Sequence, residues 1–278
     1  MIDTRSGRLW RRAYSAAMAS RTRPLDPGST ACVGSWPARP RLPELSAGQV
    51  HVWLAQLDDE NVAQLVAALS PDEHKRAARV LDQRKRTRWM RAHGVLRALL
   101  GLYTGLDASV LRFGEEANGK PRLLPGDGGL TAAYEGTQTL PSFNISHSGS
   151  LALLAFTADG EVGVDIELSA HRAIDEAAVA GRVLGERETE RLRALEPARR
   201  RQEFLRAWTR QEARAKCTGA GLALARAGQE RGAGRWEPWS ASLDMGPGCA
   251  ASLALEHEPG RLHCWNWNPA RLLPFCGL

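Results

Sequence analysis

Residues 163–167 read Gly163-Val164-Asp165-Ile166-Glu167, and this alternating stretch determines how the chain around it is interpreted. Side chains alternate along a strand, so Asp165 and Glu167 project from one face while Val164 and Ile166 enter the core. Two neighbouring carboxylates repel each other unless a cation or a proton lies between them. A hard divalent ion such as Mg²⁺, held by carboxylates and by phosphate oxygens of a substrate, meets this need. An edge strand with two solvated acids is the alternative that this stretch alone leaves open.

Strand and helix patterns on both sides of this stretch indicate a mixed fold. Ser70-Pro71-Asp72-Glu73 predicts a helix start, because Ser caps the first turn, Pro suits its first position and Glu follows three residues after the cap. The helical pattern continues, with one break, to Tyr103, and Gly105 ends it. Further helices are predicted over 175–195 and 198–217, and strands over 49–54, 110–113, 122–124, 142–146, 151–157, 161–166, 250–256 and 262–267. The order strand, helix, strands, helices, strands predicts an α+β fold.

The composition restricts the class of protein. The chain has 278 residues, of which 43% are hydrophobic, and this supports a packed core in one large or two small domains. No apolar run approaches the roughly 20 residues that cross a bilayer, so a soluble protein is expected. Five cysteines without a CxxC pair are typical of reduced thiols, which predicts a cytoplasmic location. The net charge of +6 favours polyanionic partners: phosphorylated small molecules, acidic proteins or nucleic acid.

The two ends of the chain lack a regular pattern. Residues 1–46 are rich in Arg, Ser, Pro and Gly without sustained periodicity, and we expect a disordered extension there. Their Arg-rich, nearly acid-free part also leaves open an organelle transit peptide. Residues 269–278 are expected to form a separate tail.

A second group of residues lies on the helix expected after the proline at 197. Phe204, Trp208, Glu212 and Lys216 follow each other at intervals of four and therefore form one stripe, apolar in its first half and charged in its second. The apolar half can pack the helix against the protein, which leaves Glu212 and Lys216 at the edge of the contact. The alternative is an ordinary Glu–Lys pair that stabilises the helix by about 0.2–0.5 kcal/mol.

A third group lies at the end of the strand expected at 142–146. Residues 143–149 read FNISHSG, so the strand ends in small hydrogen-bonding residues. Ser146, His147 and Ser148 could offer a phosphate two hydroxyls, an imidazole and backbone amides. A nucleophilic Ser–His pair is disfavoured, because adjacent strand residues point to opposite faces. A polar turn whose groups bond to each other is the alternative.

Two basic features are also compatible with phosphate binding. Lys120 lies in a turn within the stretch NGKPR at 118–122. A dense basic surface is expected on the upstream helix, formed by Arg84, Lys85, Arg86, Arg88 and Arg91. Its ligand would be a nucleotide phosphate or a nucleic acid, and a solvated helix face is the alternative.

Taken in order, these stretches resemble the signatures of the Sfp-type 4′-phosphopantetheinyl transferase family. Residues 119–121 match the family's GKP turn and residues 144–148 its NISHS strand end. Residues 163–167 match its G-[IV]-D-[IV]-E strand, and residues 208–216 its W-[ST]-x-K-E-[AS]-x-x-K helix. The similarity covers roughly residues 50 to 220, and four motifs in register make it specific. It implies a pseudo-twofold α+β fold of two similar halves, here 47–135 and 136–268, with coenzyme A bound between them.

The resemblance also implies an activity. Phosphopantetheine would move from coenzyme A to a serine of an acyl or peptidyl carrier protein, with Mg²⁺ required and 3′,5′-ADP released. Such carriers serve fatty acid, polyketide or nonribosomal peptide assembly and are typically acidic around the modified serine, which suits the positive net charge. A cytoplasmic monomer that binds neither nucleic acid nor a membrane is expected.

The site residues implied by this resemblance fall into two sets. The metal-site acids are Asp165, Glu167 and Glu212. The residues matched to coenzyme A contacts are Arg76, Arg79, Arg88, Lys120, Ser146, His147 and Lys216. Glu212 is the candidate general base for the carrier serine, and Lys216 would neutralise charge that develops toward the leaving 3′,5′-ADP.

Gln211 departs from the family pattern, which has lysine at this position. A glutamine can hydrogen-bond a phosphate oxygen but cannot neutralise it. Arg210 and Arg214 are candidates for compensation, although helix geometry turns them toward other sides. Two alternatives stay open: a degenerate homologue that binds coenzyme A or a carrier protein without efficient catalysis, and an unrelated basic nucleic-acid-binding protein.

Overall fold

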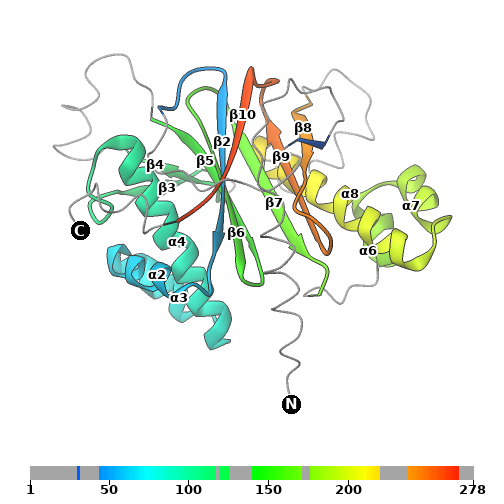
Figure 1. The fold of residues 1–278 in the computed structure, drawn as a ribbon. Coiled ribbons are helices and arrows are strands. Elements are labelled where there is room, and N and C mark those ends of the chain that lie inside the picture. Colours follow the sequence, from blue (N-terminus) through cyan, green and yellow to red (C-terminus); the bar gives the residue numbers. More distant parts are fainter. Residues whose placement is uncertain are drawn as a thin grey trace.

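Two four-stranded sheets pack against each other at the centre of the molecule, and one long helix covers the outer face of each (Figure 1). The computed structural model describes residues 30–31, 44–116, 119–124, 140–170, 176–219 and 237–268. The predictions for most of 1–46, for residue 118 and for the tail at 269–278 lie outside the described residues. No helix in the described ranges is long and apolar enough to cross a membrane.

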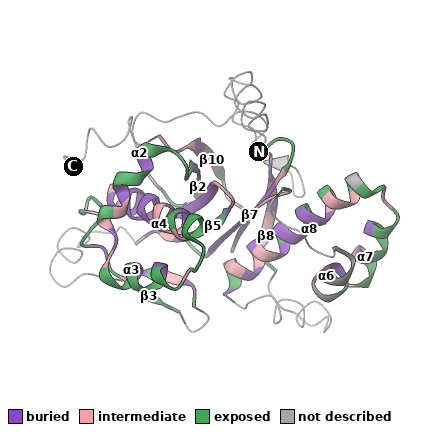
Figure 2. Ribbon diagram, turned by 90° about the horizontal axis from the view of Figure 1, so that it is seen from below, coloured by how far each residue is buried: buried purple, intermediate pink, exposed green. Residues whose placement is uncertain are grey.

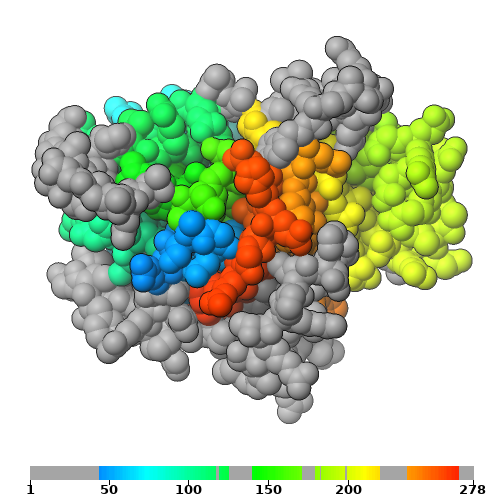
Figure 3. Space-filling model, turned by 90° about the horizontal axis from the view of Figure 1, so that it is seen from above, coloured from blue at the N-terminus to red at the C-terminus, as the bar shows by residue number. Residues whose placement is uncertain are grey.

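The first sheet has the strand order β10-β2-β6-β5. Its strands are β2 (Gln49–Gln56), β5 (Ser142–Ser148), β6 (Leu151–Thr157) and β10 (Arg261–Asn266). β5 and β6 pair antiparallel, as do β6 and β2, whereas β10 runs parallel to β2. Figure 3 shows β10 beside β2, so a strand late in the chain completes the sheet that begins near residue 49.

The second sheet has the strand order β1-β8-β9-β7. Its strands are β1 (Thr30–Ala31), β7 (Val162–Leu168), β8 (Trp239–Leu243) and β9 (Cys249–Leu255). β9 pairs antiparallel with both β7 and β8. β1 pairs parallel with β8, so the expectation of disorder is wrong for these two residues of the extension. A separate hairpin consists of β3 (Phe113–Glu115) and β4 (Pro121–Leu123).

The two long helices repeat one arrangement on the two sheets. α4 (Gln83–Thr104) packs on the first sheet and α8 (Pro197–Thr218) on the second. Each ends at a glycine in the left-handed region, Gly105 at φ 71° and Gly219 at φ 64°, where other residues are strained. The shorter helical segments are α2 (Glu60–Ala63), η1 (Gln64–Ala68), α3 (Pro71–Ala78), α6 (Glu176–Val183) and α7 (Glu186–Arg193).

Alternate residues of β2 divide the core into two layers. Trp53 packs toward α4 together with Leu99 and Phe156. Val52 lies in the layer between the two sheets, together with Val164 of β7. Buried residues accordingly line the strands and the sheet-facing sides of both long helices (Figure 2).

Gly163 allows β7 and α8 to approach closely. A Cβ atom at this position would collide with the carbonyl oxygen of Ala213 and the amide nitrogen of Cys217, both in the backbone of α8. Only a residue without a side chain fits there. This contact places the C-terminal turns of α8, including Lys216, directly over β7.

The α+β prediction is confirmed. The capping box at Ser70 and Glu73 is present, and β6 spans the residues expected for it. β8 was not expected, because 239–243 (WSASL) mixes two serines with apolar residues and lacks a clear strand pattern. The strand expected at 110–113 begins only at Phe113. Cys217 and Cys249 are free thiols, but Cys264 is disulfide-bonded, so the expectation of reduced cysteines is wrong for Cys264.

Candidate active site

Three side chains from three elements meet where β7 borders α8. Asp165 of β7 is 5% exposed, and its Oδ1 atom accepts hydrogen bonds from Ser146 Oγ of β5 at 2.8 Å and from Lys216 Nζ of α8 at 2.7 Å. Lys216 also donates to Ser146 Oγ at 3.0 Å and to the Val164 carbonyl at 3.1 Å. A buried carboxylate is costly without a counter-charge, and here the ammonium supplies it.

The other carboxylate oxygen of Asp165 is an unusual feature of this cluster. Oδ2 is buried and has no hydrogen-bond partner, whereas buried polar atoms normally have one. Glu167 lies on the same face of β7 and supplies a second carboxylate. Mg²⁺ commonly takes one or two protein carboxylates and completes its shell with water and phosphate oxygens. The donor set therefore fits a divalent cation shared with a phosphate-bearing substrate.

Glu212 is half-buried on α8, one turn before Lys216. Within the described residues, no group of three acidic, histidine or cysteine side chains is arranged to hold a metal ion. The expected set of Asp165, Glu167 and Glu212 is thus not assembled as a three-ligand site. The position of Glu212 at the edge of the α8 contact leaves it suited to act on a substrate.

A row of polar side chains on β5 connects that strand to β7. Asn144, Ser146 and Ser148 alternate along β5, so they share one face, and all three are buried. Asn144 Oδ1 accepts a hydrogen bond from the Val164 amide at 2.9 Å. Side chains of β5 therefore connect the facing edges of the two sheets at this point.

Ser148 orients Glu167. Its Oγ atom donates to Glu167 Oε2 at 3.0 Å and accepts from the Leu168 amide at 3.1 Å. One hydroxyl thus fixes the carboxylate relative to the backbone of its own strand. The sequence placed Ser148 in a possible phosphate-binding strand end but did not predict its contact with Glu167. The alternation of Asn144, Ser146 and Ser148 was the signal that could have indicated it.

The apolar half of the α8 stripe packs as expected. Phe204 and Trp208 are 1% and 6% exposed and lie in a buried cluster with Ala250 of β9. Thr209, the next residue, makes a buried hydroxyl contact with Ser252 of β9 at 3.0 Å. These contacts hold α8 on the second sheet and carry Glu212 and Lys216 to its edge.

His147 lies on the opposite face of β5 from Ser146 and keeps an exposed edge. Burial of part of the ring lowers the pKa of His147, and the charges of the neighbouring His93 and Lys216 lower it further. His93 belongs to α4, where it stacks on Trp89 with ring centroids 3.8 Å apart. His93 of α4 and Lys216 of α8 thus both lie close enough to His147 to disfavour its protonation. Sequence reasoning did not include His93, because nothing in its local pattern distinguishes it.

Lys120 is not in this cluster. Its ammonium donates to Glu161 Oε2, to the Val162 carbonyl at 2.9 Å and to the Cys217 carbonyl at 3.5 Å. Three acceptors use all three of its N–H donors, and the side chain is 7% exposed. Without a ligand, Lys120 thus joins β7 to the end of α8, and its contact with a phosphate of coenzyme A stays a prediction.

Arg88 is also paired within the protein. Its guanidinium donates to both carboxylate oxygens of Asp58, at 2.8 and 2.6 Å, and is 11% exposed. This bidentate pair lowers the pKa of Asp58 and raises that of Arg88. The expected phosphate contact by Arg88 would require the pair with Asp58 to open.

The other predicted contacts on the upstream helices are exposed. Arg76 pairs with Glu115 of β3 at 2.6 Å, and both side chains are about half exposed. Arg79 caps the end of α3 and is exposed. Arg86 and Arg91 donate to the carbonyls of Val80 and Leu57. Like Arg88, both thus donate to acceptors within the protein.

Gln211 is buried on α8, and the two arginines near it do not take the place of the family lysine. Arg210 donates to Ser242 Oγ at 3.3 Å, and Arg214 to Ser240 Oγ at 2.9 Å. Both serines belong to β8, two strands away from β7. The arginines therefore point away from Asp165.

Comparison with known proteins identifies the class to which this site belongs. A model of the 4′-phosphopantetheinyl transferase superfamily matches residues 161–232, which include Asp165, Glu212 and Lys216. The chain is 35% identical over 191 residues to the 4′-phosphopantetheinyl transferase HetI of Nostoc sp., an alignment that covers 68% of this chain and 76% of that protein. Over 174 residues it is 28% identical to the putative 4′-phosphopantetheinyl transferase slr0495 of Synechocystis sp., with 63% and 66% covered.

A third relative is the 4′-phosphopantetheinyl transferase Sfp of Bacillus subtilis, which is 26% identical over 168 residues, with 60% of this chain and 68% of that protein covered. The chain belongs to the 4′-phosphopantetheinyl transferase family. The family and the transferase activity expected from the four motifs are thereby confirmed.

Proposed function

We propose that this chain transfers 4′-phosphopantetheine from coenzyme A to the hydroxyl of a serine in an acyl or peptidyl carrier protein, in a reaction that requires Mg²⁺ and releases 3′,5′-ADP. The observation that carries the proposal is the cluster of Asp165, Lys216 and Ser146, with one buried carboxylate oxygen left without a partner. All three residues occupy positions of the family motifs.

Asp165 and Glu167 would hold the metal ion. A divalent cation bound there supplies positive charge to the pyrophosphate of coenzyme A. Ser148 keeps the Glu167 carboxylate oriented before any ligand arrives, so little reorganisation is needed on binding.

Lys216 and Glu212 act on the reacting groups. The serine hydroxyl attacks the phosphorus that carries pantetheine, a new P–O bond forms, and the P–O bond to 3′,5′-ADP breaks. Glu212 takes the proton of the hydroxyl, directly or through water. Lys216 neutralises the charge that grows on the leaving 3′,5′-ADP, which is the main requirement of phosphoryl transfer.

The remaining contacts of the donor substrate lie around this cluster. Ser146 and His147, on either face of the end of β5, would contact the phosphates of coenzyme A. Burial lowers the pKa of His147 in the free protein, and a bound phosphate would favour its protonation. Arg76 of α3, which pairs with Glu115 at the surface, and Arg79, which caps α3, would contact the adenosine 3′-phosphate.

The net charge of the chain is the basis for the proposed protein partner. The net charge of +6 favours approach of an acidic carrier, and such steering raises association rates more than affinity. A cytoplasmic monomer is the form we propose for this encounter.

Intact-protein mass spectrometry of an apo carrier protein tests the proposal. The carrier is incubated with coenzyme A, Mg²⁺ and the chain, and parallel samples contain a chelator or the Glu212→Gln variant. A mass gain of one phosphopantetheine, lost in both parallel samples, is the expected result. No gain on several carriers, despite measurable coenzyme A binding, would indicate a degenerate homologue, and Gln211→Lys would then be the next variant.

A further inference from the structure

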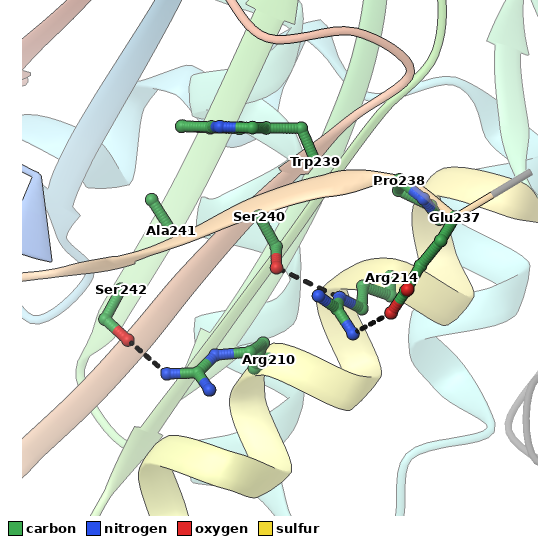
Figure 4. A pocket seen from close by; sticks show the side chains of 8 residues that line it. All are labelled: Arg210, Arg214, Glu237, Pro238, Trp239, Ser240, Ala241 and Ser242. Carbon is green, nitrogen blue, oxygen red and sulfur yellow. Dashed lines mark hydrogen bonds and ion pairs between the residues drawn. The ribbon is translucent and has the colours of Figure 1, made fainter. Parts of the chain in front are cut away.

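A groove of about 250 Å³ lies between α8 and β8 (Figure 4). Arg210 and Arg214 line it from α8, and Ser240 and Ser242 line it from β8. The two arginines stand two residues before and after Glu212, which turns them about 160° away from it around the helix. The groove therefore lies on the opposite side of α8 from the candidate general base.

The charges around this groove do not balance. Arg214 pairs with Glu237, but Arg210 forms no ion pair with any described residue. The charge of Arg210 lowers the pKa of Glu188 on α7, but Glu188 pairs with Arg191 at 2.7 Å. Two guanidinium groups thus face one groove, and its one lining carboxylate among the described residues, Glu237, pairs with Arg214 only.

The surroundings of Arg214 also favour an anion in the groove. Burial lowers the pKa of Arg214, and the neighbouring Arg210 lowers it further, while Glu237 raises it. Of the two neighbouring charges Glu237 has the larger effect, so burial accounts for the net lowering of the pKa. A second anion in the groove would add to the stabilisation that Glu237 gives the buried guanidinium charge.

We propose that this groove binds one anionic group, a phosphate or a carboxylate, through the guanidinium groups of Arg210 and Arg214 and the hydroxyls of Ser240 and Ser242. Planar guanidinium donors in a fixed geometry suit both kinds of oxyanion. Each arginine already donates to a β8 hydroxyl, at 3.3 Å from Arg210 and 2.9 Å from Arg214, so both are held in place before a ligand arrives.

The strand register relates this groove to the candidate active site. Ser242 pairs with Ser252, and Ser252 pairs with Asp165. Two spacings between neighbouring strands separate Ser242 from Asp165 by about 10 Å. An anion in the groove is thus a neighbour of the transfer site without belonging to it. Its source is either a free phosphate or an acidic side chain on a protein that reaches across α8.

Isothermal titration with inorganic phosphate at low ionic strength tests the proposal. The proteins compared are the wild type, Arg210→Gln and the matched control Arg206→Gln, which changes an exposed arginine one turn earlier on α8. We expect Arg210→Gln to weaken one phosphate-binding component by about tenfold or more, as for other hydrogen bonds to charged groups, and Arg206→Gln to leave it unchanged. Phosphate bound near Lys216 would persist in both variants.

A second measurement, the KM for an apo carrier protein, identifies the source of the anion. If Arg210→Gln also raises the KM for an apo carrier protein, the anion is an acidic side chain of that partner; an unchanged KM indicates a free anion. Equal phosphate affinity in all three proteins, together with an unchanged carrier KM, would overturn the proposal. The titration needs no transfer activity, so failure of the proposed reaction would not be confused with failure of this site.

Discussion

Lys216 Nζ lies 2.7 Å from Asp165 Oδ1, which joins the last turns of α8 to the middle of β7. The lysine side chain is 28% exposed and the aspartate side chain 7% exposed, so the pair lies just inside the protein surface. A cation of the protein therefore already occupies one oxygen of the carboxylate that would bind a metal ion. Lys216 and a divalent ion must share or compete for Asp165.

Removing the ammonium group is expected to separate metal binding from catalysis. In Lys216→Met, Asp165 loses its counter-charge, so we expect Mn²⁺, used as a spectroscopic substitute for Mg²⁺, to bind about tenfold more tightly in the absence of substrate. The transfer rate should nevertheless fall by about 100-fold or more, because charge on the leaving group is no longer neutralised. Electron paramagnetic resonance measures free Mn²⁺ directly.

The control for this variant is Lys120→Met, which removes a lysine paired with Glu161 rather than with Asp165. Its Mn²⁺ affinity should equal that of the wild type. Weaker Mn²⁺ binding in Lys216→Met than in the wild type would show that the two cations do not compete for Asp165.

Ser148→Ala is expected to affect metal dependence more than coenzyme A binding. The variant removes the hydrogen bond to Glu167 Oε2, so the carboxylate loses its fixed orientation. We expect the Mg²⁺ concentration for half-maximal rate to rise about tenfold, as for other residues that orient metal ligands, with the KM for coenzyme A nearly unchanged. Ser109→Ala, which removes a hydroxyl bonded to Asp107 in the loop after α4, is the control. Equal effects on both constants would argue against a positioning role.

Gly163→Ala is expected to separate β7 from α8. The added methyl group meets the backbone of Ala213 and Cys217, which cannot move as a flexible side chain could. We expect a loss of at least about 2 kcal/mol in the free energy of unfolding. Gly181→Ala is the matched control, because nothing lies within 4 Å of its new Cβ and α6 would gain up to about 1 kcal/mol. Urea denaturation compares the two, and equal stabilities would contradict the close contact.

Glu73 should make stability depend on acid pH. Burial alone would raise its pKa, but hydrogen bonds from His93 and the Ser70 amide and the charge of Arg97 lower it to about 2 from 4.5. A carboxyl with a depressed pKa stabilises the fold above its unfolded pKa, and this contribution is lost as pH falls from about 4.5 toward 2. Glu73→Gln should cost about 3 kcal/mol at pH 7.

Denaturant titrations at pH 7 and pH 3 check this prediction. The difference between wild type and Glu73→Gln should shrink at pH 3, whereas the exposed Glu44→Gln should match the wild type at both values. A difference that stays constant with pH would mean that Glu73 acts through packing alone.

The sequence predicted the features that depend on local pattern. The alternation of 163–167 placed Asp165 and Glu167 on one face of a strand, and the four-residue spacing on α8 placed Lys216 beyond a buried Trp208. These relations follow from the periods of strands and helices, so no tertiary information was needed.

The partners of the basic residues could not be predicted in the same way. Lys120 pairs with Glu161, 41 residues away, and Arg88 pairs with Asp58, 30 residues away. Such pairs depend on which elements the fold brings together, and each carboxylate looks like any other in the sequence. β8 was missed for a related reason, since its strand is defined by pairing with β9 and not by its own residues.

The assignment of the Asp165 cluster as the active site is tested most directly with the Asp165→Ala variant. The measured quantity is the rate at which an apo carrier protein gains the mass of one phosphopantetheine. Asp72→Ala, which removes an exposed carboxylate on α3, is the control. We predict that Asp165→Ala lowers the rate by at least about 1,000-fold while Asp72→Ala stays within about twofold of the wild type. An Asp165→Ala variant that remains folded and transfers phosphopantetheine at the wild-type rate would contradict the assignment of this cluster as the active site.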